Sequence, residues 1–524
     1  MRLWLLSLRH FSRPLPSPRR RDRPGRPGRA CSAVLACALG MASCGPAAGP
    51  TDGGPLDGGA RTVRDRIVEP ELEERVSARP AFATLAVRGL GERELALEVT
   101  RDATYAHRRR VSLRGVWEWI EAEGEVFHDV VVHPSGDLTL AVEDTRRARD
   151  GFSLVRSGPD GEVRSRAPLP SAPLPTSDLE PGLPDPPWLG RARPIGALGQ
   201  GWVRLVARGE DLVVVFQSLV AADASDLVSA VSALAWRGEA WSARWTRLVD
   251  GRHRVEPPLW SYDEFRFIDV LTRPLLAVDP DDGAIVVGRT WTQSRCDAAR
   301  RQYSEFTRQR CFEEATGNVE SRVLPFFFTA FSAEGGRLGS HTFVPAGGHY
   351  YGVHDLDARD GAVVVVGTVA EADGAEARLY PSRPGGAPDM VAFDGLLAVL
   401  DRASGATRLE RHLDRGRGDL FLAVRWTEGG ILTAGATDWD RWPGGMSVSR
   451  GSDPWVVWLD PSDGDLAVAA FDRPSASRHA LAYAVESFTD RLVVAGADDA
   501  PMTHSGDGGR LDAMTFGGLH LTLR

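Results

Sequence analysis

The chain has 524 residues, of which 43% are hydrophobic, and its formal net charge at pH 7 is −9. Residues 1–43 contain nine arginines and one aspartate, so the rest of the chain carries a net charge of −17. Because such an acidic body repels phosphate backbones, nucleic acid is excluded as an expected partner. No apolar run of 18 or more residues occurs, so the sequence predicts no transmembrane helix.

The first 43 residues have the pattern of an export signal peptide. An arginine-rich segment precedes an apolar stretch from Ala30 to Ser43, which is too short to span a bilayer. Residues 41–45 (MASCG) then resemble the lipobox of bacterial lipoproteins, with Met41 where leucine is usual. The resemblance implies that Cys44 becomes the lipidated N-terminus. The alternative is an ordinary cleaved signal with Cys44 as an incidental thiol.

Residues 44–80 are predicted to be a flexible linker behind this anchor. Residues 45–60 (GPAAGPTDGGPLDGGA) contain no side chain larger than leucine, so burial cannot offset the entropy lost on ordering them. Val68–Val76 contains four glutamates and is interpreted as a solvated spacer, with a short helix as the alternative. The sequence therefore predicts an exported cell-envelope protein at the outer membrane, the cell surface or the periplasm. Its only contact with the membrane would be the lipid.

Residues 81–114 are predicted to form an accessory segment with a hairpin over Phe82–Val99, which either stands alone or belongs to a seventh unit of the repeat that follows. From residue 115 to 524 one pattern recurs: a short apolar run, a Gly/Asp turn, and a second apolar run ending in a small residue. Runs of four to seven residues rich in Val and Leu favour strands over helices. The pattern predicts six hairpins: Val130–Val142, Val203–Phe216, Leu275–Thr290, Val353–Val369, Leu420–Thr437 and Leu481–Ala497.

Small residues near the ends of the second strands indicate that a neighbouring backbone approaches closely there. These residues are Gly288, Gly367, Gly435 and Gly496. A second type of hairpin alternates with the first, at Phe152–Ala167, Ala230–Arg247, Phe326–Phe343, Leu396–His412 and Trp455–Phe471. Two hairpins make a four-stranded antiparallel sheet, which is one blade of a β-propeller.

We therefore predict an all-β chain with a propeller over residues 115–524, favouring six blades, with seven as the alternative. The final hairpin near Met514–Leu523 is short, and Val116–Ile120 is expected to complete its blade. These hairpins resemble the secreted and lipid-anchored β-propeller repeat proteins of Gram-negative bacteria. The resemblance implies the fold and not a function, because such families carry unrelated activities.

The turns inside the hairpins are short, whereas the connections between hairpins are long. In a four-stranded blade the two kinds of connection emerge on opposite faces, so one face is expected to carry every long segment and to bind partners. These segments are Pro168–Gly201, Asp250–Arg266, Trp291–Arg322, Glu371–Ala387, Asp438–Asp453 and Asp498–Arg510.

Two of these segments contain the candidate binding residues. Trp439 and Trp442 stand beside Asp440, and flat indole faces next to a carboxylate suit sugar rings or a protein partner. The alternative is that both indoles pack beneath the loop. His504 and Asp507 lie in a Gly/Asp-rich turn, which is interpreted as a structural turn or as one that holds a cation.

Cys296 and Cys311 are predicted to form a disulfide, because the protein is expected to be exported, with free thiols as the alternative. Closing a loop of about 15 residues contributes about 3 kcal/mol. No metal site is predicted, and calcium is the one cofactor left open. Asp279–Gly283 begins like a calcium loop but lacks the later acidic ligand, so it is interpreted as a solvated turn.

The sequence contains no G-x-S-x-G, H-E-x-x-H, P-loop or dinucleotide-binding motif. The favoured function is therefore a binding or scaffold module that recognises a protein or glycan through its long-connection face, without catalysis. The alternative is a secreted glycan-active hydrolase or lyase, which predicts acidic side chains roughly 5–10 Å apart over the centre of the propeller.

Overall fold

The computed structural model describes most of the region from residue 83 to residue 523, with gaps between the strands. The described ranges, besides isolated positions, are 83–101, 107–144, 152–173, 199–219, 227–249, 275–290, 326–346, 348–371, 394–415, 419–437, 453–461, 466–470, 480–489, 491–498 and 517–523. Within them all regular structure is β, and none of these segments forms a helix long and apolar enough to span a bilayer.

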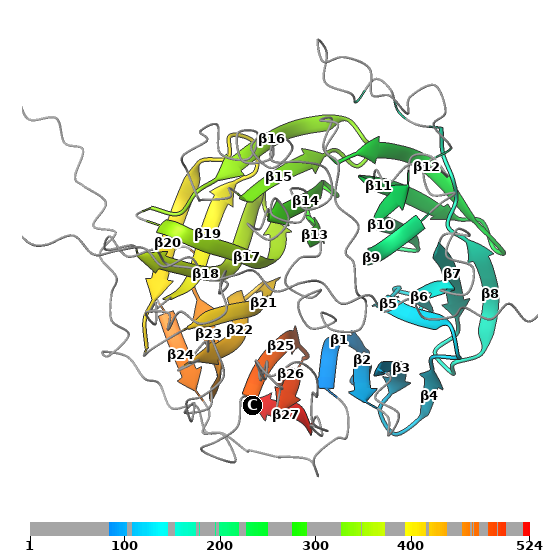
Figure 1. Ribbon diagram of the computed structural model, residues 1–524, viewed down its shortest axis with the longest axis horizontal. Helices are drawn as coiled ribbons and strands as arrows, with labels where there is room; N and C mark the ends of the chain where they lie inside the picture. The colour runs from blue at the N-terminus through cyan, green and yellow to red at the C-terminus, as the bar shows by residue number, and fades with distance from the viewer. Residues whose placement is uncertain are drawn as a thin grey trace, which may run out of the picture. The chain divides into compact units, whose positions relative to one another are not determined.

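The strands form seven antiparallel sheets that follow one another around a common centre (Figure 1), so this part of the chain is a seven-bladed β-propeller. Seven, given as the alternative at the sequence level, is right, and the favoured count of six is wrong. The first four blades are β1 to β4 (Ala83–Leu90, Arg93–Arg101, His107–Leu113, Trp117–Ile120), β5 to β8 (Glu125–Val132, Leu138–Asp144, Phe152–Ser157, Val163–Pro168), β9 to β12 (Gly199–Arg208, Asp211–Leu219, Leu227–Trp236, Trp241–Leu248) and β13 to β16 (Leu275–Val278, Ile285–Thr290, Phe326–Phe331, Arg337–Phe343).

The last three blades complete the ring. They are β17 to β20 (Gly348–Arg359, Ala362–Glu371, Asp394–Asp401, Thr407–Leu413), β21 to β24 (Leu420–Thr427, Gly430–Thr437, Asp453–Leu459, Leu466–Ala470) and β25 to β27 (Ala480–Ser487, Leu492–Asp498, Gly517–Leu523). The described part of blade 7 has three strands, in the order β25-β26-β27.

The first blade explains the error in the blade count. Phe82–Val99 contains its first hairpin, and Trp117–Ile120 is the fourth strand of this same blade, paired with β3. It does not complete the blade of the last hairpin, as the sequence had suggested. The expected boundary at 114/115 therefore falls in the turn between β3 and β4.

The six first hairpins and five second hairpins expected from the sequence are confirmed by the strand pairing. The second strands are buried on both faces, which is why they are continuous apolar runs such as Val363–Val366. The core lies between blades: one cluster joins Val286 and Phe328 of blade 4 to Leu356 and Val365 of blade 5.

The predicted close approach of a neighbouring backbone is confirmed at three of the four small residues. A β-carbon at Gly367, Gly435 or Gly496 would lie 1.8–1.9 Å from a carbonyl oxygen of the first strand of the same blade. At these three positions the first strand contains a β-bulge, which pushes its backbone toward the second strand. At Gly288 the close neighbours are the side chains of Leu356 and Phe326.

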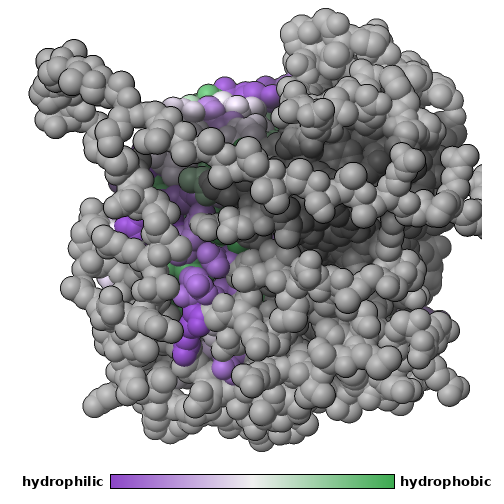
Figure 2. All heavy atoms as spheres, turned by 60° about the vertical axis from the view of Figure 1, so that its left-hand side comes forward, coloured by the Kyte–Doolittle hydropathy of each residue, from purple (hydrophilic) through white to green (hydrophobic). Residues whose placement is uncertain are grey.

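Exposed and partly covered side chains alternate along fourth strands such as β8 and β16. Figure 2 shows that the described residues which reach the surface on this side of the molecule are mainly hydrophilic, with small hydrophobic areas between them.

The two kinds of connection lie on opposite faces because every sheet is antiparallel and meanders in chain order. The turns between first and second strands and between third and fourth strands share one face, which we call the short-turn face. The other connections join strand ends at the opposite, long-connection face, and most of their residues lie outside the described ranges.

Candidate functional site

The first strand of each blade is an edge strand at the centre of the ring (Figure 1). An edge strand has unpaired N–H and C=O groups that must find partners. Six of these seven strands also carry charged side chains that meet near the centre, and we call this set the central ion network. Its members are Arg88, Asp129, Arg204, Asp355, Asp357, Arg425 and Glu486.

The network alternates in charge from blade to blade. The carboxylate of Asp129 in blade 2 lies 4.0 Å from the guanidinium of Arg88 in blade 1. It also lies 4.0 Å from the guanidinium of Arg204 in blade 3. Arg204 then reaches past blade 4 to Asp355 of blade 5, with Nη1 and Oδ1 3.7 Å apart. Arg425 of blade 6 lies 3.3 Å from Glu486 of blade 7.

The aspartates of the network also satisfy the open edge of the following blade. Asp129 accepts a hydrogen bond from the N–H of Leu205, at 2.9 Å. Asp355 accepts one from Val424 at 3.0 Å, and Asp357 one from Trp426 at 2.8 Å. Each carboxylate thus connects two neighbouring first strands.

Burial and neighbouring charges shift the pKa values of this network in different directions. Burial raises the pKa of Asp357 to about 6, and Asp355 adds to the rise, whereas Arg425 and the backbone N–H groups oppose it. Burial also lowers the pKa of Arg88, and the adjacent Arg425 lowers it further. Burial lowers the pKa of Arg425 as well, but Glu486, Asp355 and Asp357 outweigh this effect and raise it. Asp357 therefore changes its charge in mildly acidic solution.

A second ionic cluster joins blades 2 and 3 at the short-turn face. Arg156 is 2% exposed, with Nε 3.0 Å from Asp137 and Nη2 paired with Glu210 of the next blade. Its guanidinium lies over the rings of Trp236 and Trp241, at 4.6 and 5.5 Å from their centroids. Such planar packing suits arginine and fixes the two blades to each other.

The acidic turn Asp279–Gly283 is not merely solvated, which corrects the sequence interpretation. Asp279 is fully buried, and its carboxylate accepts hydrogen bonds from the backbone N–H of Asp360 and Gly361 in blade 5. Arg402 pairs with both Asp279 and Asp282. Within the described ranges, no three His, Cys, Asp or Glu side chains are grouped so that they could hold a metal ion.

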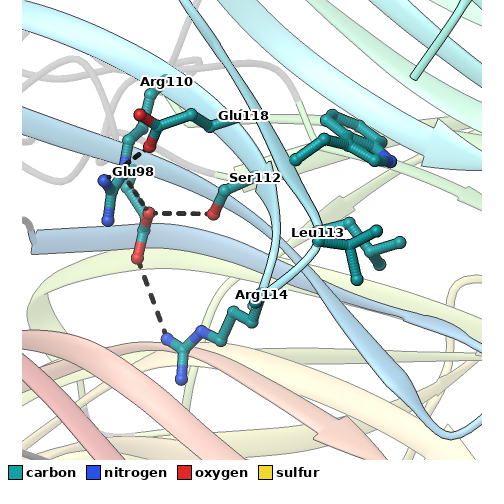
Figure 3. A pocket seen from close by; sticks show the side chains of 9 residues that line it. Glu98, Arg110, Ser112, Leu113, Arg114 and Glu118 are labelled. Carbon is teal, nitrogen blue, oxygen red and sulfur yellow. Dashed lines mark hydrogen bonds and ion pairs between the residues drawn. The ribbon is translucent and has the colours of Figure 1, made fainter. Parts of the chain in front are cut away.

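A pocket of about 490 Å³ lies on the face of blade 1 that is turned toward blade 7. Figure 3 shows Glu98 at its centre, with Arg110, Ser112 and Arg114 converging on this carboxylate. Leu113 points to the other face of the sheet, where it packs in the core toward blade 2.

The binding and modification residues expected from the sequence all lie outside the described residues. These are Cys44, Cys296, Cys311, Trp439, Asp440, Trp442, His504 and Asp507. Their roles therefore stay predictions.

The central ion network was missed by the sequence analysis, although its signal is visible in the sequence. In three first strands a charged residue directly follows Ala-Val: Arg88, Arg425 and Glu486. A charge repeated at one position of an otherwise apolar strand indicates that this position is not in an apolar core.

No protein-family model and no curated protein matches this chain. Solved structures that are similar to it include the α-L-arabinofuranosidase of Fusarium graminearum (11% identity, TM-score 0.39, covering 76% of this chain and 94% of that one). Another is the polysaccharide lyase Uly1 (8% identity, TM-score 0.41, covering 84% of this chain and 90% of that one). A third is a protein of unknown function from Bacteroides caccae (12% identity, TM-score 0.32, covering 74% of this chain and 93% of that one). The resemblance of these proteins to the chain is one of fold alone.

Proposed function

We propose that this protein is an exported, lipid-anchored propeller that binds a protein or glycan partner through its long-connection face. The observation that carries the proposal is the difference between the two faces of the ring. Short turns that are tied to neighbouring blades form one face, and the longer connections of the chain join strand ends at the other.

The short-turn face is fixed by contacts between successive blades. Trp245 and Arg208 of blade 3 both donate to the carbonyl of Ala333 in blade 4, at 3.1 and 3.0 Å. Arg491 of blade 7 donates to the carbonyl of Glu92 in blade 1, at 2.7 Å. Because these turns are short and occupied by such contacts, they offer little free surface for a partner.

The long-connection face is the better binding surface for a physical reason. A rigid ring holds the ends of each connection in place, so the segments between them can vary in sequence without cost to the core. Trp439, Trp442, His504 and Asp507 all belong to connections of this face. Aromatic side chains beside carboxylates suit a glycan ring or a protein hot spot.

The test is thermal unfolding of the chain from residue 45 onward with peptidoglycan fragments and envelope oligosaccharides, together with pull-downs of protein partners. A ligand that binds the folded state raises the midpoint, and Trp439→Ala with Trp442→Ala should abolish the rise. Glu428→Ala, at a side chain 93% exposed on the short-turn face, is the matched control and should leave it unchanged. Equal loss of binding in the control would overturn the assignment to this face.

The anchor is tested separately. The full chain should incorporate a labelled fatty acid when expressed in a Gram-negative host, and Cys44→Ala should abolish the label. Incorporation that survives the substitution, or none in the parent chain, contradicts the lipid anchor and leaves the binding face to be judged by its own experiment.

A glycan-active enzyme is the second candidate, and the central ion network is the observation that favours it. One guanidinium, that of Arg204, joins Asp129 and Asp355, and Asp357 nearby has a pKa raised to about 6. A carboxyl group with a raised pKa near a second carboxyl group is what acid–base hydrolysis of a glycosidic bond requires. We rank it second because Asp129, Asp355 and Asp357 already accept backbone hydrogen bonds.

Release of reducing ends from a polysaccharide panel tests this second candidate. Activity that falls at least a hundredfold in Asp357→Asn, while the variant keeps its far-ultraviolet spectrum and unfolding midpoint, would establish it. Activity that persists in this variant, or none in the parent chain, rules out this carboxyl as the acid.

A further inference from the structure

The junction between blades 7 and 1, which we call the seam, is charged at positions that are apolar in other junctions. The residues of β6 that pack toward the preceding blade include Leu138 and Leu140, and those of β18 include Val363 and Val365. Apolar faces of this kind hold one sheet on the next by burial. At the seam, the described strands of both blades present polar side chains instead.

Blade 1 presents charged side chains to the seam. Leu95 and Leu97 of β2 lie in the core that is shared with blade 2. Because side chains alternate along a strand, Glu94 and Glu98 lie on the opposite face, toward blade 7. Figure 3 shows this face, on which Arg110 of β3 donates a hydrogen bond to Glu98. The second and third strands of blade 1 thus meet blade 7 with ionised groups.

Blade 7 presents polar side chains to the seam as well. Leu519 of β27 belongs to the core that is shared with blade 6. The alternate residues, His520 and Thr522, lie opposite Ala495 and Val493 of β26, which belong to the seam. His520 and Thr522 therefore face blade 1 from the third strand of blade 7.

The apolar cluster described at the seam is small. Its buried members are Val87 of β1 and Ala484, Val493 and Ala495 of blade 7, and Phe488 packs against them. None of the four buried side chains is larger than valine. Parting the two blades along these residues therefore exposes little apolar surface and costs little hydrophobic free energy.

Glu94 connects the two blades through its charge. Its carboxylate lies 2.8 Å from Nε2 of His520 and 3.7 Å from Nη2 of Arg491, both in blade 7, and 3.1 Å from Nη1 of Arg114 in blade 1. Arg491 also donates to the carbonyl of Glu92, at 2.7 Å. Burial alone would raise the pKa of Glu94, but the hydrogen bond from His520 and the neighbouring positive charges outweigh it and lower the pKa. The carboxylate therefore keeps its charge in neutral and mildly acidic solution.

We propose that the seam is an ionic latch at which the ring opens before its other junctions part, and that salt promotes this opening. Ion pairs between partly exposed side chains are screened by salt, because the Debye length falls to about 3 Å at 1 M. Salt does not weaken apolar contacts in this way. A rise in salt concentration therefore loosens the seam and leaves the apolar junctions closed.

The latch leads to the central ion network, because Arg88 and Glu486 lie on opposite sides of the seam. Arg88 belongs to β1 and Glu486 to β25, and their charges interact across the junction. Opening separates these two first strands and gives water and small solutes a lateral entry to the centre of the ring. The latch goes beyond the proposed function and depends neither on the long-connection face nor on the lipid anchor.

Labelling of buried cysteines in the folded full chain tests the latch. Val493→Cys reports on the seam, and Val364→Cys, in the core between blades 5 and 6, is its matched control. Both valines are fully buried, and each stands three residues before the close-packed glycine of its second strand.

We expect a thiol reagent in 1 M sodium chloride to label Val493→Cys roughly tenfold faster than Val364→Cys, because local opening exposes only the first. Lowering the salt to 0.05 M should slow labelling at Val493→Cys and should not slow it at Val364→Cys. Peptide mapping by mass spectrometry identifies the labelled cysteine, so the native cysteines do not interfere. Equal rates at the two positions, or a rate at the seam that salt does not raise, overturn the proposal.

Glu94→Gln tests the centre of the latch. Loss of this charge should raise the rate at Val493→Cys in low salt to the rate that high salt otherwise produces. Glu92→Gln, two residues away at a side chain 63% exposed, is the control and should change the rate less than about twofold. A rate in Glu94→Gln no higher than in Glu92→Gln contradicts the latch. If Val493→Cys does not fold, Ala495→Cys with Ala434→Cys is a second matched pair, because each alanine is fully buried directly before the glycine of its strand.

Discussion

The carboxylate of Asp129 accepts a hydrogen bond at 2.9 Å from the backbone N–H of Leu205, which lies in the edge strand of the next blade. Asp355 makes the same contact with Val424 three blades further along, at 3.0 Å. First strands have no ladder partner on their inner edge, so these carboxylates supply acceptors that the sheets lack. The centre of the ring is thus held by side chains of one blade bonded to the backbone of the next.

Removing the side chain of Asp129 should therefore destabilise the protein more than replacing its carboxylate with a neutral amide. Asp129→Ala leaves the N–H of Leu205 and the guanidinium of Arg204 without this partner, and we expect the free energy of unfolding to fall by about 3–5 kcal/mol. Asp129→Asn keeps an acceptor and should lose roughly half as much. Urea unfolding of both variants measures the difference. Equal losses would show that the backbone contact contributes nothing.

Arg156 and Arg164 provide a matched pair at the junction of blades 2 and 3, because both contact Asp137. Arg156 is 2% exposed and Arg164 is 53% exposed. Arg156→Gln leaves a buried carboxylate partly unpaired and should cost about 3 kcal/mol or more in urea unfolding. Arg164→Gln should cost less than about 1 kcal/mol. Similar values for the two would mean that burial does not control this cluster.

Gly367 tests the close packing between first and second strands. A β-carbon there would lie 1.8 Å from the carbonyl oxygen of Gly352, so Gly367→Ala forces the backbone apart and should cost about 3 kcal/mol or more. Gly336→Ala is the control, because its nearest neighbour, the hydroxyl of Ser332, would lie 3.4 Å away. We expect thermal unfolding to show a large fall in midpoint for the first variant and little change for the second.

Much of this fold is predictable from local patterns, and Gly367 is an example. The glycine stands out because it directly follows four valines, and a missing side chain at that position indicates close approach of a neighbour. Blade 1 was harder to recognise because β3 reads HRRRVSL and does not look like a buried strand. Arg110 faces the pocket beside blade 7, whereas Arg109 is buried and donates to the carbonyl of Phe127 in blade 2. Both faces of β3 therefore carry charge, and this hides the strand.

The central ion network was not predictable to the same degree. Arg204 and Asp355 are 151 positions apart in the sequence, and only ring closure brings their side chains to 3.7 Å. A charged residue within an apolar strand can be noticed in the sequence. Which blade it reaches depends on the number of blades, and the sequence favoured the wrong number.

Asp357 should make stability depend on pH in a defined direction. Burial raises its pKa from the ordinary 3.8 to about 6, so the folded protein binds this proton more tightly than the unfolded chain. The resulting stabilisation is fully present below about pH 4 and is lost as the pH rises through about 6, amounting to at most about 3 kcal/mol. The wild type minus Asp357→Asn difference in unfolding free energy should therefore decrease between these pH values. A difference that is flat in pH contradicts the assignment.

Asp279 tests whether the acidic turn binds a cation or ties two blades together. Its carboxylate is fully buried and accepts from Gly361 at 3.0 Å, beside the guanidinium of Arg402. Asp279→Asn should cost about 3 kcal/mol in urea unfolding, because it leaves Arg402 with only one acid of the turn. Asp281→Asn, at a side chain 51% exposed, should cost less than about 1 kcal/mol. Since Arg402 already occupies the acidic side chains, we expect calcium and EDTA to leave the unfolding midpoint unchanged. A midpoint that rises with calcium and loses this rise in Asp279→Asn would instead make the turn a cation site.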